Sequence, residues 1–152
     1  MNSYETTIET TASAAQVLAV LTDPSAIRSW SPVPFELEGE VGARLETGRR
    51  TRVSGSLAGL RVGFDVEVHS ADADGLRLHA DGPVAIDVDY GLRELAGGSE
   101  VRARVSLGRS RGLSARLIGK ATEALLSAGA LDGAAARIAR AAEAAGPVAV
   151  AA

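Results

Sequence analysis

The sequence predicts an α+β protein in which a curved antiparallel sheet of about seven strands wraps around one long C-terminal helix. Between residues 33 and 107 apolar residues recur at every second position, as in half-buried strands. From 112 to 145 they recur in steps of three and four, as along one face of a helix. A length of 152 residues suits one core. We therefore expect a single domain over residues 1–145 and a flexible tail over 146–152.

A short strand and two short helices are expected before the main run of strands. The segment YETTIE, residues 4–9, alternates polar and apolar side chains. Ser13 is placed to cap a helix, and that helix must end before Pro24, because proline disfavours helical geometry in the residue before it. Proline is also favoured in the first turn of a helix, so the segment PSAIRSW predicts a second short helix that docks Trp30 into the core.

The middle of the chain predicts six further strands joined by short turns. They lie at residues 33–38, 49–57, 60–70, 76–81, 84–95 and 100–108. A hairpin closed by AGGS would place Tyr90 opposite Val105, and a turn at residues 58–59 would place Val53 opposite Phe64. These registers bring the apolar side chains onto one face of the sheet.

The C-terminal third predicts a single long helix with one apolar stripe. The stripe consists of Leu113, Leu117, Ala121, Ala124, Ala128, Leu131, Ala135, Ile138 and Ala142. Three glycines interrupt this segment, and each costs about 1 kcal/mol relative to alanine inside a helix. Bends or close approaches are therefore expected at Gly119, Gly129 and Gly133.

Composition excludes several classes of function. The net charge is −3 with no basic stripe, so no nucleic-acid partner is implied. The chain has no cysteine, and neither a metal-ligand pattern nor a cofactor-binding motif stands out, so no metal and no cofactor is expected. No apolar run approaches 18 residues and the N-terminus lacks a signal pattern, which predicts a cytoplasmic protein without integral membrane association. Abundant Arg, Ala and Gly reflect a GC-rich, bacterial type of genome.

Three stretches carry a resemblance to a known superfamily. SAAQVLAVLTDPSAIRSWSP, residues 13–32, resembles the opening motif of the START/Bet v 1-like (SRPBCC) superfamily, in particular its polyketide cyclase/dehydrase and lipid-transport group. LETGRR and ELAGGSEVRARVSL resemble the third strand and the last hairpin of that group. The order of elements is that of its helix-grip fold, and the likeness covers about residues 4 to 143. It implies a cavity between sheet and helix that holds sterols, lipids or polyketides, and a few members are cyclases or dehydratases.

Eight residues are expected to line such a cavity, and none is assigned a catalytic role. They are Trp30, Arg49, Thr51, Phe64, Tyr90, Leu117, Ala121 and Leu125. By the predicted register Arg49 and Thr51 point inward, where an arginine would require an anion; alternatively, Arg49 lies at the open end of its strand and reaches water. Trp30 could stack on a ligand or simply fill the core, and the Tyr90 hydroxyl could orient a ligand or make a structural hydrogen bond.

The expected function is the binding or transport of a small hydrophobic or amphipathic molecule, lipid-like or polyketide-like. The first alternative is an aromatase/cyclase or dehydratase using the same cavity, with Arg49 stabilising an enolate and Tyr90 acting as acid or base. The second is a regulatory protein-interaction module with a closed core. The sequence leaves open whether the protein forms a homodimer.

Overall fold

The computed structural model describes residues 2–23, 26, 30, 35–38, 45–57, 60–110 and 112–145. In chain order the elements are β1 (Asn2–Thr10), α1 (Ala14–Thr22), β2 (Phe35–Glu38), β3 (Arg50–Leu57), β4 (Leu60–Asp72), β5 (Gly75–Asp81), β6 (Val84–Leu95), β7 (Gly98–Ser110), α3 (Gly112–Ser127) and α4 (Ala130–Ala145). Of the second short helix expected over residues 24–30, Ala26 and Trp30 are described, and both are helical. The predicted tail, 146–152, lies outside the described residues.

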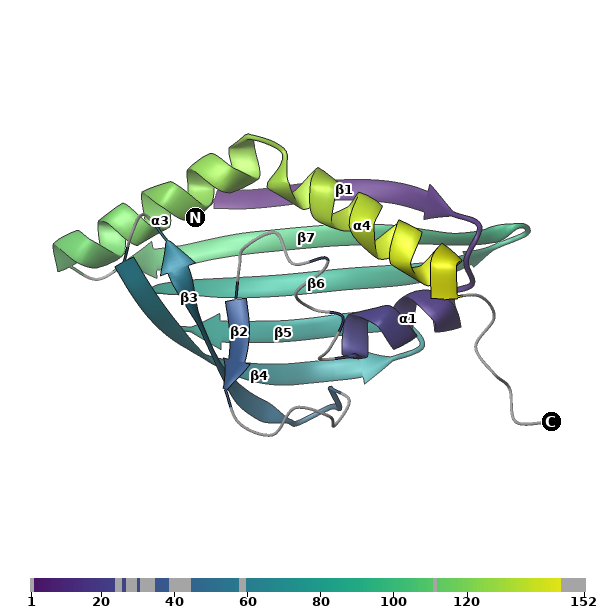
Figure 1. The fold of residues 1–152 in the computed structure, drawn as a ribbon, viewed down its shortest axis with the longest axis horizontal. Helices are drawn as coiled ribbons and strands as arrows, with labels where there is room; N and C mark the ends of the chain where they lie inside the picture. The colour runs from purple at the N-terminus through teal and green to yellow at the C-terminus, as the bar shows by residue number, and fades with distance from the viewer. Residues whose placement is uncertain are drawn as a thin grey trace.

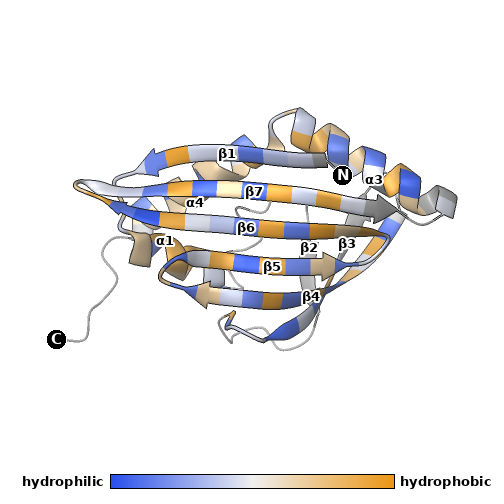
Figure 2. Ribbon diagram, turned by 180° about the vertical axis from the view of Figure 1, so that it is seen from behind, coloured by the Kyte–Doolittle hydropathy of each residue, from blue (hydrophilic) through white to orange (hydrophobic). Residues whose placement is uncertain are grey.

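All seven strands belong to one antiparallel sheet in the order β1-β7-β6-β5-β4-β3-β2. The helices α1, α3 and α4 lie on one face of this sheet (Figure 1). Seen from behind, the strands show alternating hydrophilic and hydrophobic residues, as expected when alternate side chains face the helices and solvent (Figure 2). The predicted α+β fold class and the sheet of about seven strands are confirmed.

The helix α1 begins at the residue that the sequence indicated. The Ser13 hydroxyl accepts a hydrogen bond from the backbone N–H of Gln16, at 3.2 Å, and the Gln16 side chain accepts one from the N–H of Ser13, at 2.8 Å. This reciprocal pair satisfies two backbone donors that would otherwise be unpaired at the helix start. At the other end, the Thr22 carbonyl accepts a hydrogen bond from the N–H of Leu45, which ties α1 to the segment before β3.

The hairpin registers were predicted correctly at one turn and displaced at another. Val53 lies opposite Phe64, as expected. Tyr90, however, pairs with Ala103, so the expected pairing with Val105 is wrong by two positions. The reason is a shorter turn, because the strands pair up to Leu95 and Gly98 and leave two residues between them. A shift of two positions keeps every side chain on its own face, so the core is unchanged.

The expected single C-terminal helix is divided into α3 and α4. Gly129 separates them with a φ of 93°, a left-handed conformation that glycine adopts readily at a helix end. The predicted apolar stripe is confirmed along α4, where Leu131, Ala135, Ile138 and Ala142 are buried.

The predicted stripe is wrong along α3. This helix buries Ala115, Ile118, Thr122 and Leu126 instead, while Leu117, Ala124 and Ala128 are exposed. The break at Gly129 allows each helix to turn its own face toward the sheet, so one continuous stripe is no longer required.

The core lies between the sheet and the helices. Its largest fully buried side chains are those of Tyr90, Phe64, Leu21, Leu76 and Ile138. They come from three strands and two helices, so the sheet and the helices share one cluster of apolar contacts. Within the described part of the chain, no helix is both long and apolar enough to cross a membrane.

Candidate functional site

Two of the residues singled out in the sequence, Trp30 and Tyr90, are in direct contact in the core. Tyr90 comes from β6 and is 1% exposed, and Trp30 is 5% exposed. Their ring centroids are 5.6 Å apart and the ring planes meet at 83°. This edge-to-face arrangement is a favourable one for aromatic pairs, and it fixes the indole against the sheet.

A third residue, Arg137 of α4, completes what we call the Trp30–Tyr90–Arg137 corner. Its Nη2 donates a hydrogen bond to the backbone carbonyl of Trp30, at 3.4 Å. The Arg137 side chain is half-buried and lies over Gly133, whose missing side chain leaves it room. Arg137 was not predicted from the sequence, because the apolar stripe on this helix passes beside it. The sequence signal that could have indicated this residue is the position of a cationic side chain directly before Ile138, which belongs to the apolar stripe.

The indole nitrogen of Trp30 is the unusual atom of this corner. Trp30 Nε1 is buried and has no hydrogen-bond partner, and no other buried side-chain nitrogen or oxygen of the described residues is left in that state. Buried donors in native proteins are nearly always paired with protein or water. Leaving one unpaired costs on the order of 1–3 kcal/mol. An acceptor at Nε1 would recover this free energy.

The Tyr90 hydroxyl stays protonated at neutral pH. Burial raises the pKa of Tyr90 well above its usual range, and the positive charge of Arg137 opposes that shift only in part. The corner therefore contains one fixed positive charge and two neutral aromatic groups that each carry a hydrogen on nitrogen or oxygen.

Two exposed carboxylates, on β6 and on α4, have structural partners at the two ends of the segment between β1 and α1. Glu94, exposed near the end of β6, accepts a hydrogen bond from the backbone N–H of Ala14 at 2.8 Å, at the start of α1. Glu143 accepts one from the Thr10 hydroxyl at 2.5 Å. Among the described residues, Tyr90 is the one titratable side chain in the fully buried set.

The three site residues expected on β3 and β4 occupy different environments. Phe64 is fully buried in the core. Thr51 is half-buried opposite Val66, which keeps the predicted inward parity. Arg49 is half-buried in a turn just before β3, where its N–H donates to the Glu46 carbonyl at 3.0 Å and the neighbouring Gly48 has a φ of 85°. The Arg49 carbonyl accepts a hydrogen bond from the N–H of Val68 at 2.8 Å, so Arg49 lies at the end of its strand, where the pairing of β3 with β4 stops.

The three site residues expected on α3 lie toward its outer side. Leu117 is 51% exposed, Leu125 is 37% exposed and Ala121 is half-buried. Since Ile118 and Thr122 of the same helix are buried, the face of α3 that meets the core is a different one. In this structure the two leucines do not line the core.

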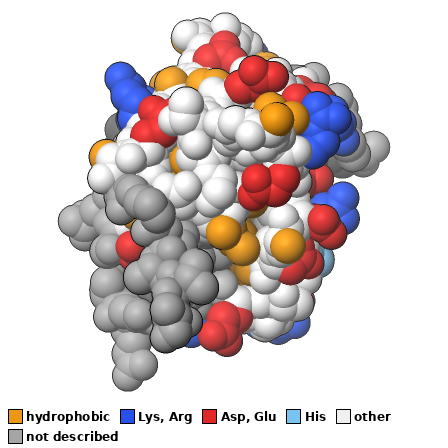
Figure 3. Space-filling model, turned by 90° about the vertical axis from the view of Figure 1, so that its right-hand side faces the viewer, with side chains coloured by type: hydrophobic (Ala, Val, Ile, Leu, Met, Phe, Trp, Pro, Cys, Tyr) orange, Lys and Arg blue, Asp and Glu red, His pale blue; other side chains and the backbone are white. Residues whose placement is uncertain are grey.

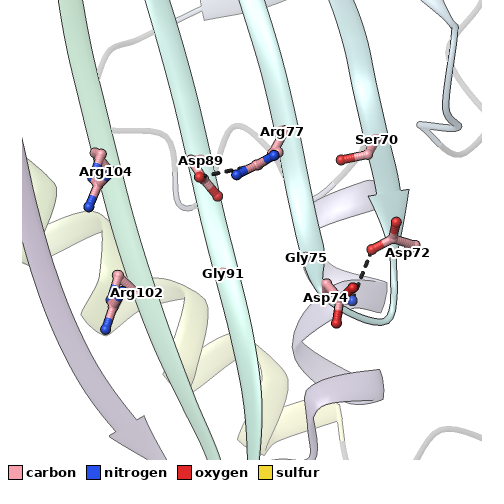
Figure 4. Close-up of a pocket in the computed structure, with 9 residues that line it drawn as sticks. All are labelled: Ser70, Asp72, Asp74, Gly75, Arg77, Asp89, Gly91, Arg102 and Arg104. Atoms are coloured by element: carbon pink, nitrogen blue, oxygen red, sulfur yellow. Dashed lines mark hydrogen bonds and ion pairs between the residues drawn. The ribbon is translucent and has the colours of Figure 1, made fainter.

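A separate hollow lies on the helix-free face of the sheet, over β4 to β7 (Figure 4). It has a volume of about 600 Å³ and is lined mainly by charged side chains, among them Asp72, Asp74, Arg77, Arg102 and Arg104. Arg77 Nε lies 3.3 Å from Asp89 Oδ2, and Asp72 accepts a hydrogen bond from the N–H of Asp74 at 2.9 Å. Ion pairs along exposed strands explain this lining without an apolar ligand.

The end of the molecule where α1 and the last turn of α4 lie has a mixed surface. Figure 3 shows Asp and Glu side chains spread over this end among small apolar groups, with Lys and Arg toward its edges. In the described part of this surface, charged side chains of one sign do not gather into a patch that would indicate a binding site. The Trp30–Tyr90–Arg137 corner in the core is therefore the strongest candidate site.

An antiparallel sheet that wraps around C-terminal helices and encloses a buried aromatic corner defines a protein of the helix-grip class. Residues 1–143 match the family described as polyketide cyclase / dehydrase and lipid transport, and the chain belongs to that family. The resemblance to the START/Bet v 1-like (SRPBCC) superfamily is thereby confirmed. Membership makes the chain an SRPBCC-type domain of the kind that binds hydrophobic ligands. No curated protein sequence matches it.

Several solved structures share this fold at low sequence identity. DynU16, a protein of the dynemicin biosynthetic locus, has 23% identity and a TM-score of 0.63; the alignment covers 95% of this chain and 48% of that protein. TTHA0849 from Thermus thermophilus has 15% identity and a TM-score of 0.67, with coverage of 96% and 100%. Ara h 8.0201 has 12% identity and a TM-score of 0.55, with coverage of 90% and 97%. The chain thus spans about half of DynU16 and nearly all of the other two.

Proposed function

We propose that this protein binds and carries a small hydrophobic or amphipathic molecule, lipid-like or polyketide-like, between its sheet and its C-terminal helices. The observation that carries the proposal is the unpartnered Nε1 of Trp30 at the buried contact with Tyr90. A donor in this state is stabilised by an acceptor that enters the core. Membership in a family described by polyketide conversion and lipid transport supports the same interpretation.

Binding is favoured over cyclase or dehydratase chemistry by the titratable groups of the core. A general acid or base works best when its pKa lies near the operating pH. The raised pKa of Tyr90 moves its hydroxyl away from that range, and Glu94 is engaged at the start of α1. Arg49, the residue expected to stabilise an enolate, lies in the turn before β3. A carrier requires none of these groups to exchange a proton.

A protein-interaction module with a closed core is the second candidate. The observation that favours it is the exposure of Leu117 and Leu125 on α3, because large apolar side chains on a surface are enriched where proteins meet. The homodimer that the sequence left open would be the simplest form of this candidate. In that case the core would take up no small molecule.

The deciding experiment is native mass spectrometry of the purified protein before and after extraction with organic solvent. A carrier is expected to show an added mass that extraction removes, and the mass identifies the ligand. Fluorescence titration of the extracted protein with lipids and aromatic polyketides provides a second readout, since Trp30 is the one tryptophan in the chain. An apo mass, no change in Trp30 emission and a dimeric mass would together overturn the carrier proposal in favour of the interaction module.

The cellular location stays a prediction. The sequence led us to expect a cytoplasmic protein, and a carrier of intracellular lipids or polyketides would act there. Fractionation of cells that express the full chain tests this expectation. Recovery in the cytosolic fraction is the expected outcome, and recovery outside the cell would contradict it.

A further inference from the structure

We propose that the Trp30–Tyr90–Arg137 corner receives an anionic oxygen of the ligand, and that the ligand class is therefore amphipathic molecules ending in a carboxylate. The inference rests on the proposed binding function and adds the chemistry of the bound end. It also moves the expected anion contact from Arg49, in the turn before β3, to Arg137 on α4.

Trp30 requires a particular kind of partner. An indole N–H can donate a hydrogen bond and cannot accept one. The atom that pairs with Nε1 must therefore be an acceptor, and oxygen is the common acceptor of small amphipathic molecules. A hydrocarbon in this place would leave the donor unpaired and keep the cost of its burial.

A positive charge lies beside the backbone of the same residue. Arg137 Nη2 lies 3.4 Å from the Trp30 carbonyl oxygen, so the guanidinium is fixed next to the same residue that carries the unpartnered N–H. A guanidinium has five N–H donors in a planar fork that matches the geometry of a carboxylate. A carboxylate received between the indole and the guanidinium would make charge-assisted hydrogen bonds, which are about twice as strong as neutral ones.

The remaining member of the corner does not repel an anion. The Tyr90 hydroxyl keeps its proton at neutral pH because burial raises its pKa. Its edge-to-face contact with the indole holds Trp30 in place while an anion binds. The buried set of the described residues includes no aspartate or glutamate whose charge would repel an anion in the core.

The test compares two probes that differ in charge and share an alkyl chain, dodecanoate and methyl dodecanoate, at pH 7.5. Calorimetric titration should give an affinity for dodecanoate about tenfold higher than that for the ester, as expected for the gain of a charge-assisted hydrogen bond. In ¹⁵N-labelled protein the single indole N–H signal reports Trp30 alone. It should move downfield when dodecanoate is added.

Two arginine variants separate the role of Arg137 from a general effect of charge. Arg137→Gln should reduce the preference for dodecanoate to within about twofold, since the ester still fits and the charge contact is lost. Arg140→Gln removes the same charge from an exposed position of α4 and should leave the preference unchanged. Trp30→Phe should weaken dodecanoate binding as well, and a thermal melt of each variant verifies that it is folded.

The outcomes distinguish this inference from the function on which it rests. Equal affinities for acid and ester, or equal effects of the two arginine variants, would overturn the carboxylate inference and leave a carrier of neutral molecules. Binding of neither probe, together with a native mass that shows no retained molecule, would overturn the proposed function and the inference together. Tight binding of dodecanoate without movement of the indole signal would show that the carboxylate is received elsewhere, which also overturns the inference.

Discussion

Arg137 lies across Gly133, one helical turn earlier in α4. A Cβ atom at Gly133 would be 3.2 Å from Nη1 and 4.0 Å from Cζ of Arg137. The glycine thus gives the guanidinium space beside Trp30 at the expense of helix propensity, since glycine is less favourable than alanine by about 1 kcal/mol in a helix interior. Gly133 and Arg137 together form the part of the corner that α4 contributes.

Replacing Gly133 with alanine should stabilise the protein while moving the guanidinium. Helix propensity raises the free energy of unfolding by up to about 1 kcal/mol. The methyl group is close to the tip of a flexible side chain, which can shift by a few tenths of an ångström. Urea denaturation measures the gain, and the emission of Trp30 reports the movement. A decrease in stability would mean that Arg137 is held too firmly to move.

The control for this variant is Gly129→Ala at the junction of α3 and α4. Gly129 has a φ of 93°, where a Cβ atom is unfavourable. The substitution should lower the free energy of unfolding by about 1–2 kcal/mol. The same substitution, glycine to alanine, is therefore expected to raise the free energy of unfolding at Gly133 and to lower it at Gly129, four residues away.

Gly75 is required by the backbone of Tyr90. In β5 it has a φ of 135°, and a Cβ atom there would overlap the Tyr90 carbonyl oxygen. Gly75→Ala should lower the free energy of unfolding by about 2 kcal/mol or more, because the strands β5 and β6 must separate locally. Thermal denaturation measures the loss, and a changed Trp30 emission is expected because Tyr90 supports the indole.

Gly97→Ala is the matched control for Gly75→Ala. Gly97 lies in the exposed turn between β6 and β7, and no atom is within 4 Å of the position its Cβ would take. The change in stability should stay within about 0.5 kcal/mol. Equal effects of the two substitutions would contradict the close approach at Tyr90.

The strands and their faces were predictable because their signal is local. Alternation of side chains placed Phe64 and Tyr90 on the inner face, and the pairing of Val53 with Phe64 followed from one tight turn. Even the error in the β6–β7 register left Tyr90 in the core, since it was an even number of residues. An alternating pattern thus determines which face of the sheet a side chain lies on more securely than it determines which residue lies opposite on the neighbouring strand.

The helical layer and the corner were less predictable because they depend on tertiary contacts. The left-handed geometry at Gly129 ends one helix and starts another, so α3 presents a different face to the core than the sequence predicts. The local sequence does not indicate whether a glycine will end a helix or only bend it. Arg137 is a polar residue at the edge of an apolar face, a position where most arginines reach water. Its contact with Trp30 joins residues 107 positions apart in the sequence.

Phe64 and Leu117, which the sequence placed in the same pocket, differ in burial, and substitutions at the two positions should therefore differ in their effect on stability. Phe64 is fully buried, so Phe64→Ala should lower the free energy of unfolding by about 3–5 kcal/mol. Leu117 is 51% exposed, so Leu117→Ala should change it by about 0.5 kcal/mol or less. Urea denaturation of both variants measures the difference. A large loss at Leu117 would indicate that α3 is covered in solution.

Tyr90 predicts a loss of stability at alkaline pH. The unfolded chain releases the tyrosine proton near pH 10, whereas burial raises the pKa of Tyr90 in the folded protein. Below pH 10 both states keep the proton and the group gives no pH dependence. Above it the unfolded state binds fewer protons, so the free energy of unfolding falls by about 1.4 kcal/mol per pH unit until the folded protein also ionises.

Comparison with Tyr90→Phe isolates this contribution, because the variant loses the ionisable hydroxyl and keeps the ring against Trp30. Urea denaturation at pH 8.5, 10 and 11 should show the native protein losing stability faster than the variant above pH 10, so that the difference between them narrows or reverses. Parallel curves would mean that the Tyr90 hydroxyl ionises as easily in the folded protein as in the unfolded chain, and hence that solvent reaches the corner. An open corner of that kind would also remove the cost attached to the unpaired Trp30 N–H, since water could then accept its hydrogen bond.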